Sequence, residues 1–245
     1  MKINVLTLFP EMFKSVLGTS MLAKAKEQEL ISVDLIDIRD YTQDKHRQVD
    51  DYPYGGGAGM LLKPEPIFRA IDDVDYPSQT PIIFLTPQGE TFNQAKAKEL
   101  ANYEELILLC GHYEGVDQRV REELITNEIS LGDYVLTGGE LPAMVLIDAV
   151  ARLIPGVLGS QESAVEDSFY QGILDYPHYT RPRDYKGLEV PQVLLSGDHG
   201  RIERWRRKKA LENTLHKRPD LLKDADLSVQ DQELLAEIKQ ELKEE

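Results

Sequence analysis

The sequence predicts an α/β fold, with a mostly parallel sheet that carries helices on both faces, followed by a small helical domain. In residues 1–158 of the 245-residue chain, apolar runs rich in β-branched residues alternate with helix-like segments. Strands that alternate with helices in this way form parallel sheets. Beyond this region, charged helical segments dominate. Hydrophobic residues make up 41% of the chain, which is enough for a real core.

The first domain is expected to contain at least four strands. The candidate strands are Ile3–Leu8, Val33–Ile38, Ile82–Thr86 and Leu106–Cys110. The candidate helices among them are Glu11–Glu29, Pro64–Ile71, Asn93–Ala101 and Asp117–Leu124. A longer apolar helix is expected at Leu141–Ile154, because Pro142 suits a first helical turn and Pro155 helps to end the helix. The first domain therefore spans residues 1–158.

The rest of the chain predicts a linker and a second domain. Residues 159–172 are polar and have no clear periodicity, which indicates an interdomain linker. Residues 173–245 are expected to form a helical domain around the segment Arg201–Leu215, with Asp198 as its N-cap. Two leucine-rich segments, Leu221–Leu222 and Leu234–Leu242, complete that domain.

The charge of the chain is unevenly distributed. The formal net charge is -15, which by itself argues against a polyanionic partner. However, residues Arg181–Arg218 contain eleven Lys or Arg and five Asp or Glu, whereas Pro219–Glu245 contain three and nine. A basic block followed by an acidic helix is compatible with local RNA contact. A solvated charged helix is the other interpretation, and charge alone favours it.

Two further features suggest where the protein works. Cys110 is the single cysteine, so an internal disulfide is impossible, as is usual in a reducing cytosol. The first residues lack the build of a signal peptide, and no apolar stretch is long enough to span a bilayer. We expect a cytoplasmic protein that does not contact a membrane.

Four loops are candidates for a ligand site. The glycine-rich segment Pro53–Met60 fits neither a P-loop nor a dinucleotide-binding fingerprint, and glycine content alone favours a simple surface loop. Residues Thr86–Gly89 and Cys110–Gly115 follow candidate strands, and Ser130–Glu140 comes next. Ligands of open α/β sheets bind at the carboxyl ends of strands, so these three loops together can build one pocket. Their glycines and scarce positive charges suit an adenosyl group better than a polyphosphate.

The series of motifs carries a specific resemblance. In chain order they are LFPEMF, RDYTQDKHRQVDDYPYGGGAGM, LTPQG, CGHYEG, SLGDYVLTGGELPAM, IPGVLG, EDSF, PHYTRP and VPQVLLSG, and they run from residue 8 to residue 197, nearly the whole chain. With these motifs the chain resembles the TrmD family of bacterial tRNA (guanine-N1)-methyltransferases, which belongs to the SPOUT class. One departure is His112, where we associate arginine with some family members.

The resemblance implies a fold and a cofactor that the residues alone do not indicate. It implies a deep trefoil knot over about Ile82 to Leu141, a rare feature that periodicity would never suggest. It also implies that S-adenosylmethionine binds bent within the knot. The residues that match the cofactor contacts are Leu85, Pro87, Gly111, Glu114, Leu131, Gly132, Asp133, Tyr134, Val135, Leu136, Gly138 and Gly139.

The resemblance also assigns the chemistry. Asp167 matches the base that removes the N1 proton of guanine, and Arg152 matches the residue that stabilises the guanine oxygen. Without the resemblance, both side chains would be ordinary surface charges. The substrate implied is tRNA with guanosine at position 37, with residues 173–245 as the tRNA-binding domain. The assembly implied is a homodimer with an active site shared between chains. Family members are associated with Mg²⁺, with Glu114 facing the cofactor or a metal ion, but no metal site is readable in the sequence.

Two other functions fit these residues less well. A related SPOUT enzyme that modifies ribosomal RNA would not bring the EDSF and PHYTRP segments along. A catalytically silent RNA-binding protein would not need Asp167, Arg152 and Glu114. The histidines lack metal-site spacing. Cys110 lacks a base partner in its motif, so it is expected to be a buried strand-end residue and not a nucleophile.

Overall fold

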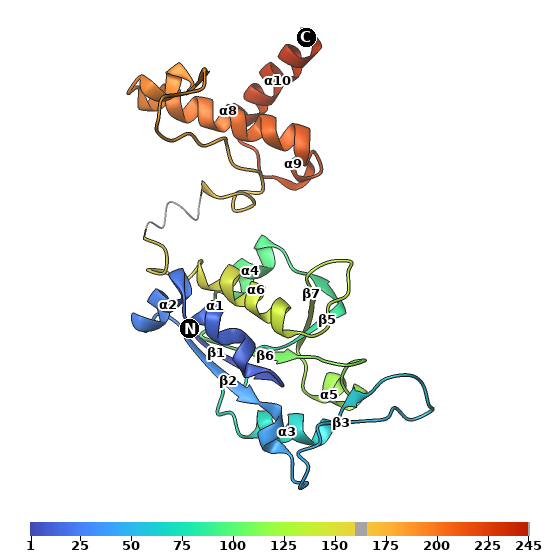
Figure 1. Ribbon diagram of the computed structural model, residues 1–245. Helices are drawn as coiled ribbons and strands as arrows, with labels where there is room; N and C mark the ends of the chain where they lie inside the picture. The colour runs from blue at the N-terminus through green and yellow to red at the C-terminus, as the bar shows by residue number, and fades with distance from the viewer. Residues whose placement is uncertain (160–165, 245) are drawn as a thin grey trace. The chain divides into compact units, whose positions relative to one another are not determined.

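The computed structural model describes residues 1–159 and 166–244, and the chain forms two compact units, Met1–Gln161 and Glu162–Glu245 (Figure 1). The first six residues of the predicted linker after Gly159 lie outside the described residues. Its last part, 166–172, forms hydrogen-bonded turns that belong to the second unit. Within the described residues, no helix is long and apolar enough to cross a membrane.

The first unit contains a five-stranded sheet whose neighbouring strands all run parallel. The prediction of a mostly parallel α/β sheet is thus confirmed. The strand order is β2 (Ser32–Asp37), β1 (Lys2–Thr7), β6 (Glu105–Cys110), β5 (Ile82–Thr91) and β7 (Asn127–Ser130). Strand β7 was not predicted, because its four residues include a single apolar side chain, Ile129, and so show no alternation.

Helices cover both faces of this sheet, as predicted (Figure 1). Alternate residues of one strand enter different cores: Val5 packs into one cluster and Leu6 into the other. Because both faces of β5 and β6 are buried, Ile82–Leu85 and Leu106–Cys110 appear in the sequence as continuous apolar runs. One core is closed by α1 (Lys14–Leu17), α2 (Ser20–Glu27), α4 (Gln94–Leu100) and α6 (Glu140–Ala151), and the other by α3 (Pro64–Asp72) and α5 (Gln118–Glu123).

The helix predicted over Glu11–Glu29 is wrong as a single element. The segment consists of the 3₁₀ helix η1 (Pro10–Phe13), then α1, then α2. Gly18 ends α1, and Thr19 has extended backbone angles, φ -132° and ψ 157°, which separate α1 from α2. The long apolar helix is confirmed, but α6 ends at Ala151 and Arg152 is its C-cap, three residues before Pro155.

Residues Thr86–Gly89, predicted as a loop after a strand, form a bulge inside β5. Ile129 of β7 pairs with both Leu85 and Glu90, so the four residues between them leave the ladder. Pro87 cannot donate a backbone hydrogen bond, and a bulge is one of the few places where a sheet tolerates proline. The pairing of β5 with β7 is therefore interrupted at the edge of the predicted pocket.

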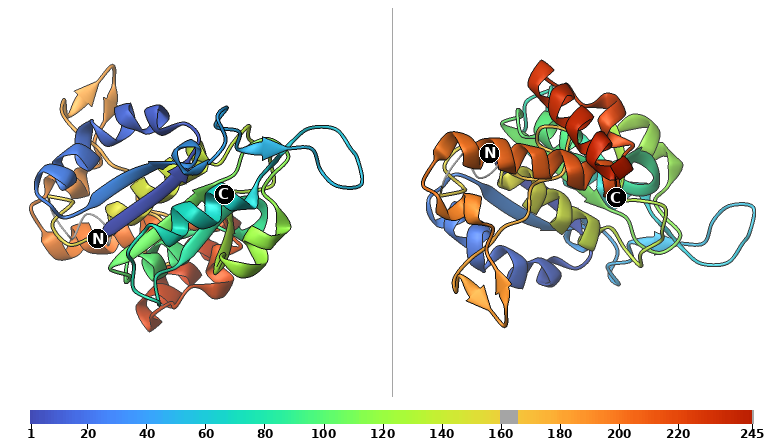
Figure 2. Two further views of the ribbon diagram at one scale, coloured as in Figure 1. Left: turned by 90° about the horizontal axis from the view of Figure 1, so that it is seen from below. Right: turned by 90° about the horizontal axis from the view of Figure 1, so that it is seen from above.

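The remaining parts of the first unit are small. The 3₁₀ helix η2 (Ile38–Tyr41) follows β2, and the strands β3 (Asp50–Asp51) and β4 (Leu61–Leu62) pair antiparallel. The glycine-rich loop between β3 and β4 projects away from the sheet (Figure 2).

The second unit is built around α8 (His199–Lys217), which packs against α10 (Val229–Glu244). Leu211, Leu234 and Ile238 are at the centre of its core. The predicted cap is confirmed, since the Asp198 side chain accepts a hydrogen bond from the backbone N–H of Arg201 at 3.1 Å. Around this pair lie the hairpin β8 (Asp184–Tyr185) and β9 (Leu188–Glu189), the 3₁₀ helix η3 (Gln192–Leu195) and α9 (Leu221–Asp224).

Candidate functional site

A cavity of about 310 Å³ opens at the bulge of β5 and at the carboxyl ends of β6 and β7. The three loops that were predicted to build one pocket do line one cavity: the β5 bulge, the loop after β6 and the loop from Ser130 to Gly139. A cavity of this size suits a small organic ligand. Its lining has many backbone groups and few charged side chains, as the sequence indicated.

Eleven of the twelve residues predicted to contact the cofactor line this cavity. Asp133 is exposed and is not among the lining residues. The backbone N–H of Tyr134 donates to the carbonyl of Gly132 at 2.8 Å, so Asp133 lies in the middle of a tight turn and faces outward. The residues that do line the cavity are Leu85, Pro87, Gly111, Glu114, Leu131, Gly132, Tyr134, Val135, Leu136, Gly138 and Gly139.

The Gly138–Gly139 pair is explained by contacts within the chain. A Cβ atom on Gly139 would lie 2.7 Å from Cys110 Cα and 2.8 Å from the backbone nitrogen of Gly111. Gly139 N–H also donates to the Gly111 carbonyl at 2.8 Å. Only glycine lets the two loops approach this closely. The close approach at Gly139 is thus between the two loops that enclose the cavity.

His112 lies at the cavity in an unusual environment. Its ring lies 4.9 Å from that of Phe9 and 4.8 Å from that of Tyr113, measured between centroids. Its Nδ1 is buried and has no hydrogen-bond partner among the described residues. Buried polar atoms are usually paired, so a ligand atom is a natural partner for Nδ1.

Sequence reasoning missed the lining residues that lie outside the three predicted loops. Phe84 is a strand residue that periodicity marks only as core, and Ile129 belongs to the unpredicted β7. Pro142 was used only as a helix-start signal.

A buried hydrogen bond joins the first residue of α6 to the last residue of β1. Glu140 is 2% exposed, and its Oε1 accepts a hydrogen bond from the Thr7 hydroxyl at 2.8 Å. Burial, and to a lesser extent the nearby Glu140 carboxylate, raises the pKa of the Cys110 thiol. A thiol with a raised pKa is a poor nucleophile. The prediction that Cys110 is a buried strand-end residue is therefore confirmed.

Glu114 connects the cavity to the glycine-rich loop. A Cβ atom on Gly59 would lie only 2.3 Å from Glu114 Cγ, and Gly59 has φ +82°. The Glu114 backbone N–H donates to the Met60 carbonyl at 3.0 Å. Across residues 1–159 and 166–244, no group of three or more His, Cys, Asp or Glu could hold a metal ion. A lone carboxylate does not distinguish a Mg²⁺ ligand from a side chain that faces the cofactor.

The second unit contains a separate cavity of about 290 Å³, and Asp167 lines it. Four carboxylates, from Glu166, Asp167, Asp175 and Glu203, surround the cavity together with Tyr176 and two arginines of α8. The Tyr176 hydroxyl donates to Glu166 Oε2 at 2.8 Å. Burial and this contact raise the pKa of Tyr176, so it stays protonated at neutral pH. The charged lining of the cavity thus consists of four carboxylates and two guanidinium groups.

The segment that carries Asp167 is anchored to α8. Ser168 Oγ donates to Asp175 Oδ1 at 2.9 Å, and the Asp175 backbone N–H donates back to Ser168 Oγ at 3.0 Å. The Leu174 N–H donates to the hydroxyl of Thr214, a fully buried residue of α8, at 2.9 Å. These contacts fix the backbone on both sides of the turn that follows Asp167.

Arg152 belongs to the first unit and Asp167 to the second. The Arg152 backbone N–H donates to the Asp148 carbonyl at 3.2 Å and so closes the last turn of α6. The Arg152 side chain is half-buried. Each of the two predicted catalytic residues thus has a defined place within its own unit.

Together these features define an α/β protein whose glycine-lined ligand cavity lies at the carboxyl ends of parallel strands, and which carries a helical unit with an acidic cavity. The family comparison makes this more specific. The model of the family tRNA (Guanine-1)-methyltransferase TrmD matches residues 1–224, and the chain belongs to this family.

Close relatives cover nearly the full length. A Moorella thermoacetica protein is 59% identical over 241 residues, 97% of this chain and 96% of that protein. A Bacillus subtilis protein is 55% identical over 243 residues, 98% and 100% of the two chains. A Dictyoglomus turgidum protein is 56% identical over 245 residues, 100% and 99%. Each of the three is named tRNA (guanine-N(1)-)-methyltransferase.

Proposed function

We propose that this enzyme transfers a methyl group from S-adenosylmethionine to N1 of guanosine 37 in tRNA, beside the anticodon. One observation carries the proposal: within a member of the tRNA (guanine-N1)-methyltransferase family, eleven residues that match the cofactor motifs line a single cavity. Fold similarity alone would not license a reaction. Here the motif residues are also brought together in space.

The cavity in the first unit is the proposed cofactor site. S-adenosylmethionine supplies an electrophilic methyl group when bound. The chain would hold it with backbone groups of the three loops, and His112 Nδ1 is a buried polar atom available to it. We also propose that Ile82 to Leu141 forms the trefoil knot of the SPOUT class. The contact of Gly139 with the loop after β6, just before α6 begins, supports a chain that returns through this region.

The reaction needs a base, because guanine N1 carries a proton and is a poor nucleophile near neutral pH. We propose that the Asp167 carboxylate accepts this proton as N1 bonds to the methyl carbon, while the bond from that carbon to the cofactor sulfur would break and the demethylated cofactor would leave as a neutral thioether. Negative charge that develops toward O6 would be stabilised by the Arg152 guanidinium. The acceptor-rich cavity around Asp167 supports this role, since the N1–H and 2-amino groups of guanine are hydrogen-bond donors.

We propose further that the enzyme is a homodimer with a shared active site. Leu141 and Val145, four residues apart on α6, are each 49% exposed, and Met12 of the neighbouring η1 is 43% exposed. Residues four apart lie on one face of a helix. Clustered exposed apolar side chains are typical of an interface. The cofactor of one protomer would then meet Asp167 of the other.

A methyl-transfer assay tests the reaction. Wild-type enzyme should methylate tRNA with G37 and leave the same tRNA with A37 unmodified, and the product should be 1-methylguanosine at position 37. Asp167→Asn keeps the shape of the side chain but removes its basicity, so the single-turnover rate should fall about 10²–10⁴-fold while cofactor affinity is unchanged. Near-normal transfer by Asp167→Asn would remove this residue from the role of base.

The shared site has its own test. A chain with Asp167→Asn is mixed with a chain whose cofactor cavity is filled by Leu136→Trp, after calorimetry has confirmed that this variant no longer binds cofactor. Leu136 suits this purpose better than Gly139, where added atoms would strike the backbone. Heterodimers should regain activity, because one of their two sites has both an intact cavity and an intact base. Purified heterodimers that stay inactive would show that each protomer works alone.

A further inference from the structure

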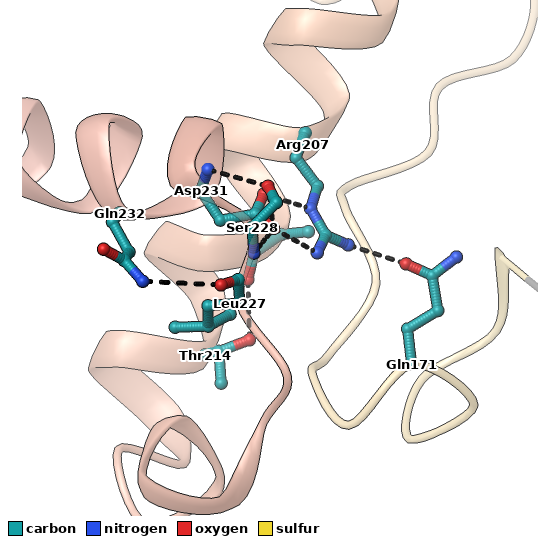
Figure 3. A network of polar contacts seen from close by, with 8 residues as sticks. Gln171, Arg207, Thr214, Leu227, Ser228, Asp231 and Gln232 are labelled. Carbon is teal, nitrogen blue, oxygen red and sulfur yellow. Dashed lines mark hydrogen bonds and ion pairs between the residues drawn. The ribbon is translucent and has the colours of Figure 1, made fainter.

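The basic face of α8 is neutralised by the second unit itself. Arg207 donates to Asp231 Oδ1 and Oδ2 at 2.7 and 2.9 Å, and the Asp231 residue is only 4% exposed (Figure 3). Arg204 bonds Glu237 at 2.6 Å. Lys208 bonds Glu241 of the same helix, α10, at 2.6 Å. The α8 cations that face α10, namely Arg204, Arg207 and Lys208, are therefore paired within the unit, and RNA phosphates need other cations of the basic block.

Another surface of the same unit has the required charge. A groove of about 430 Å³ is lined by Tyr176, His178, Tyr179, Arg181, Arg183 and Arg206, together with apolar side chains. None of the described residues that line it is acidic, although the chain as a whole carries a formal charge of -15. Arg181 and Arg183 are exposed, and the latter donates to Gln192 Oε1 at 3.0 Å.

Aromatic rings are interleaved with these cations. The Arg206 guanidinium lies 4.9 Å from the centroid of the Tyr176 ring, and the His178 ring lies 4.6 Å from the same ring. Tyr179 is 50% exposed and neighbours Trp205 at 6.4 Å. Proteins bind single-stranded nucleic acid with a positively charged groove that runs along the phosphate backbone and with aromatic rings on which the bases stack.

The groove is adjacent to the cavity of Asp167. Tyr176 and Arg206 line both the cavity and the groove. The charged residues of the cavity are mostly carboxylates, whereas those of the groove are mostly cations. Arg206 Nε is buried and has no hydrogen-bond partner among the described residues. A strand whose guanine enters the acidic cavity would therefore continue directly into a basic, aromatic groove.

We infer that this groove binds the single-stranded RNA next to the target guanosine. The flanking phosphates contact Arg181 and Arg183, and a flanking base stacks on Tyr179. The inference rests on the proposed function and assigns the binding of the flanking strand to these residues, in place of the α8 face that α10 covers.

The test measures tRNA affinity as a function of salt for the full-length enzyme. Arg181→Gln combined with Arg183→Gln should weaken binding and reduce the slope of log K against log salt by about 0.7 for each lost contact. Tyr179→Ala should weaken binding about 5- to 150-fold, whereas Tyr179→Phe, which keeps the ring, should bind normally. The control is Lys239→Gln with Lys243→Gln, which removes the same charge from exposed positions on α10 and should leave the slope unchanged.

The outcomes separate this inference from the proposed function. Groove variants should keep the single-turnover rate at saturating tRNA and their cofactor affinity, while half-saturation moves to higher tRNA concentration. Arg181→Lys with Arg183→Lys keeps the charge and should restore the salt slope. In the wild-type enzyme, bound tRNA should protect Tyr179 from hydroxyl-radical oxidation. The inference that this groove binds RNA is overturned if the folded Arg181→Gln, Arg183→Gln variant has an unchanged salt slope, or if bound tRNA does not protect Tyr179 from oxidation. Failure of the wild-type enzyme to methylate G37 overturns only the proposed reaction.

Discussion

Replacing Asp231 by asparagine should destabilise the second unit by about 2 kcal/mol at pH 7. The carboxylate is almost fully buried and is bonded by Arg207 and by the backbone N–H and hydroxyl of Ser228, at 3.0 and 2.8 Å. The Arg207 contact, followed by the Ser228 hydrogen bonds, lowers the pKa of Asp231 from 3.8 to about 2. At 1.36 kcal/mol per pH unit, this difference corresponds to about 2 kcal/mol in favour of the folded, ionised form.

The loss should depend on pH in a defined direction. The folded-state pKa is depressed, so the stabilisation is fully present above pH 4, where the unfolded chain is also ionised. It is lost as the pH falls toward 2, and about half of it should be gone near pH 3. The asparagine variant cannot titrate at this position. The difference in unfolding free energy between wild type and variant should therefore shrink between pH 5 and pH 3.

Urea unfolding followed by tryptophan fluorescence measures this difference. Trp205 is the single tryptophan and lies on α8, so its signal reports the second unit. Glu237→Gln is the matched control, because it removes an acidic partner of α8 from an exposed pair, with side chains 51% and 42% exposed. Such a pair contributes at most about 1 kcal/mol. Equal losses in the two variants, or a loss for Asp231→Asn that stays the same at pH 3, would refute the reasoning.

Two further predictions concern close packing and a buried hydrogen bond. Gly139→Ala should weaken cofactor binding at least about 10-fold and destabilise the first unit by about 1–3 kcal/mol, because the added methyl meets backbone on Cys110 and Gly111. Calorimetry would measure the binding and thermal unfolding the stability. Gly159→Ala should change neither, because no atom of the described residues lies within 4 Å of the added methyl. Thr214→Val keeps the shape of the side chain but leaves the Leu174 N–H unpaired, so the free energy of unfolding of the second unit should fall by about 1–3 kcal/mol. Urea unfolding followed by Trp205 fluorescence would measure this fall. A fall below about 0.5 kcal/mol would contradict an anchoring role for the Thr214 hydroxyl.

The sheet was predictable because its strands are buried on both faces. Strand β6 has the unbroken apolar run Leu106–Cys110, and the buried apolar residues of β1 are interrupted only by Asn4. The limits of both strands differ from the prediction by at most one residue. Strand β7 was not predicted because it has little apolar surface of its own. It joins the sheet by pairing with β5. The break between α1 and α2 was not predicted either, because only one glycine and one threonine with extended backbone angles interrupt a composition that is otherwise helical.

The cavity was predictable only in part. The rule that ligands bind at the carboxyl ends of parallel strands located it, and the family motifs named most of its residues. Neither source could show that Asp133 turns outward, because that depends on a tight turn between Gly132 and Tyr134. Neither could show that Gly139 is required by a backbone contact with a loop about 30 residues earlier in the chain. Such contacts are properties of the folded chain.

The distribution of charge in the second unit shows why counts along the chain mislead. The segment around α8 has an excess of cations, and the segment around α10 has an equal excess of anions. Because the two helices pack together, these excesses cancel locally through Arg204, Arg207 and Lys208. The groove beside the Asp167 cavity has fewer cations, but acidic side chains are absent from its described lining. A phosphate is attracted by the cations that the fold leaves unneutralised, so the shorter, aromatic-rich stretch Tyr176–Arg183 is the better candidate for binding RNA.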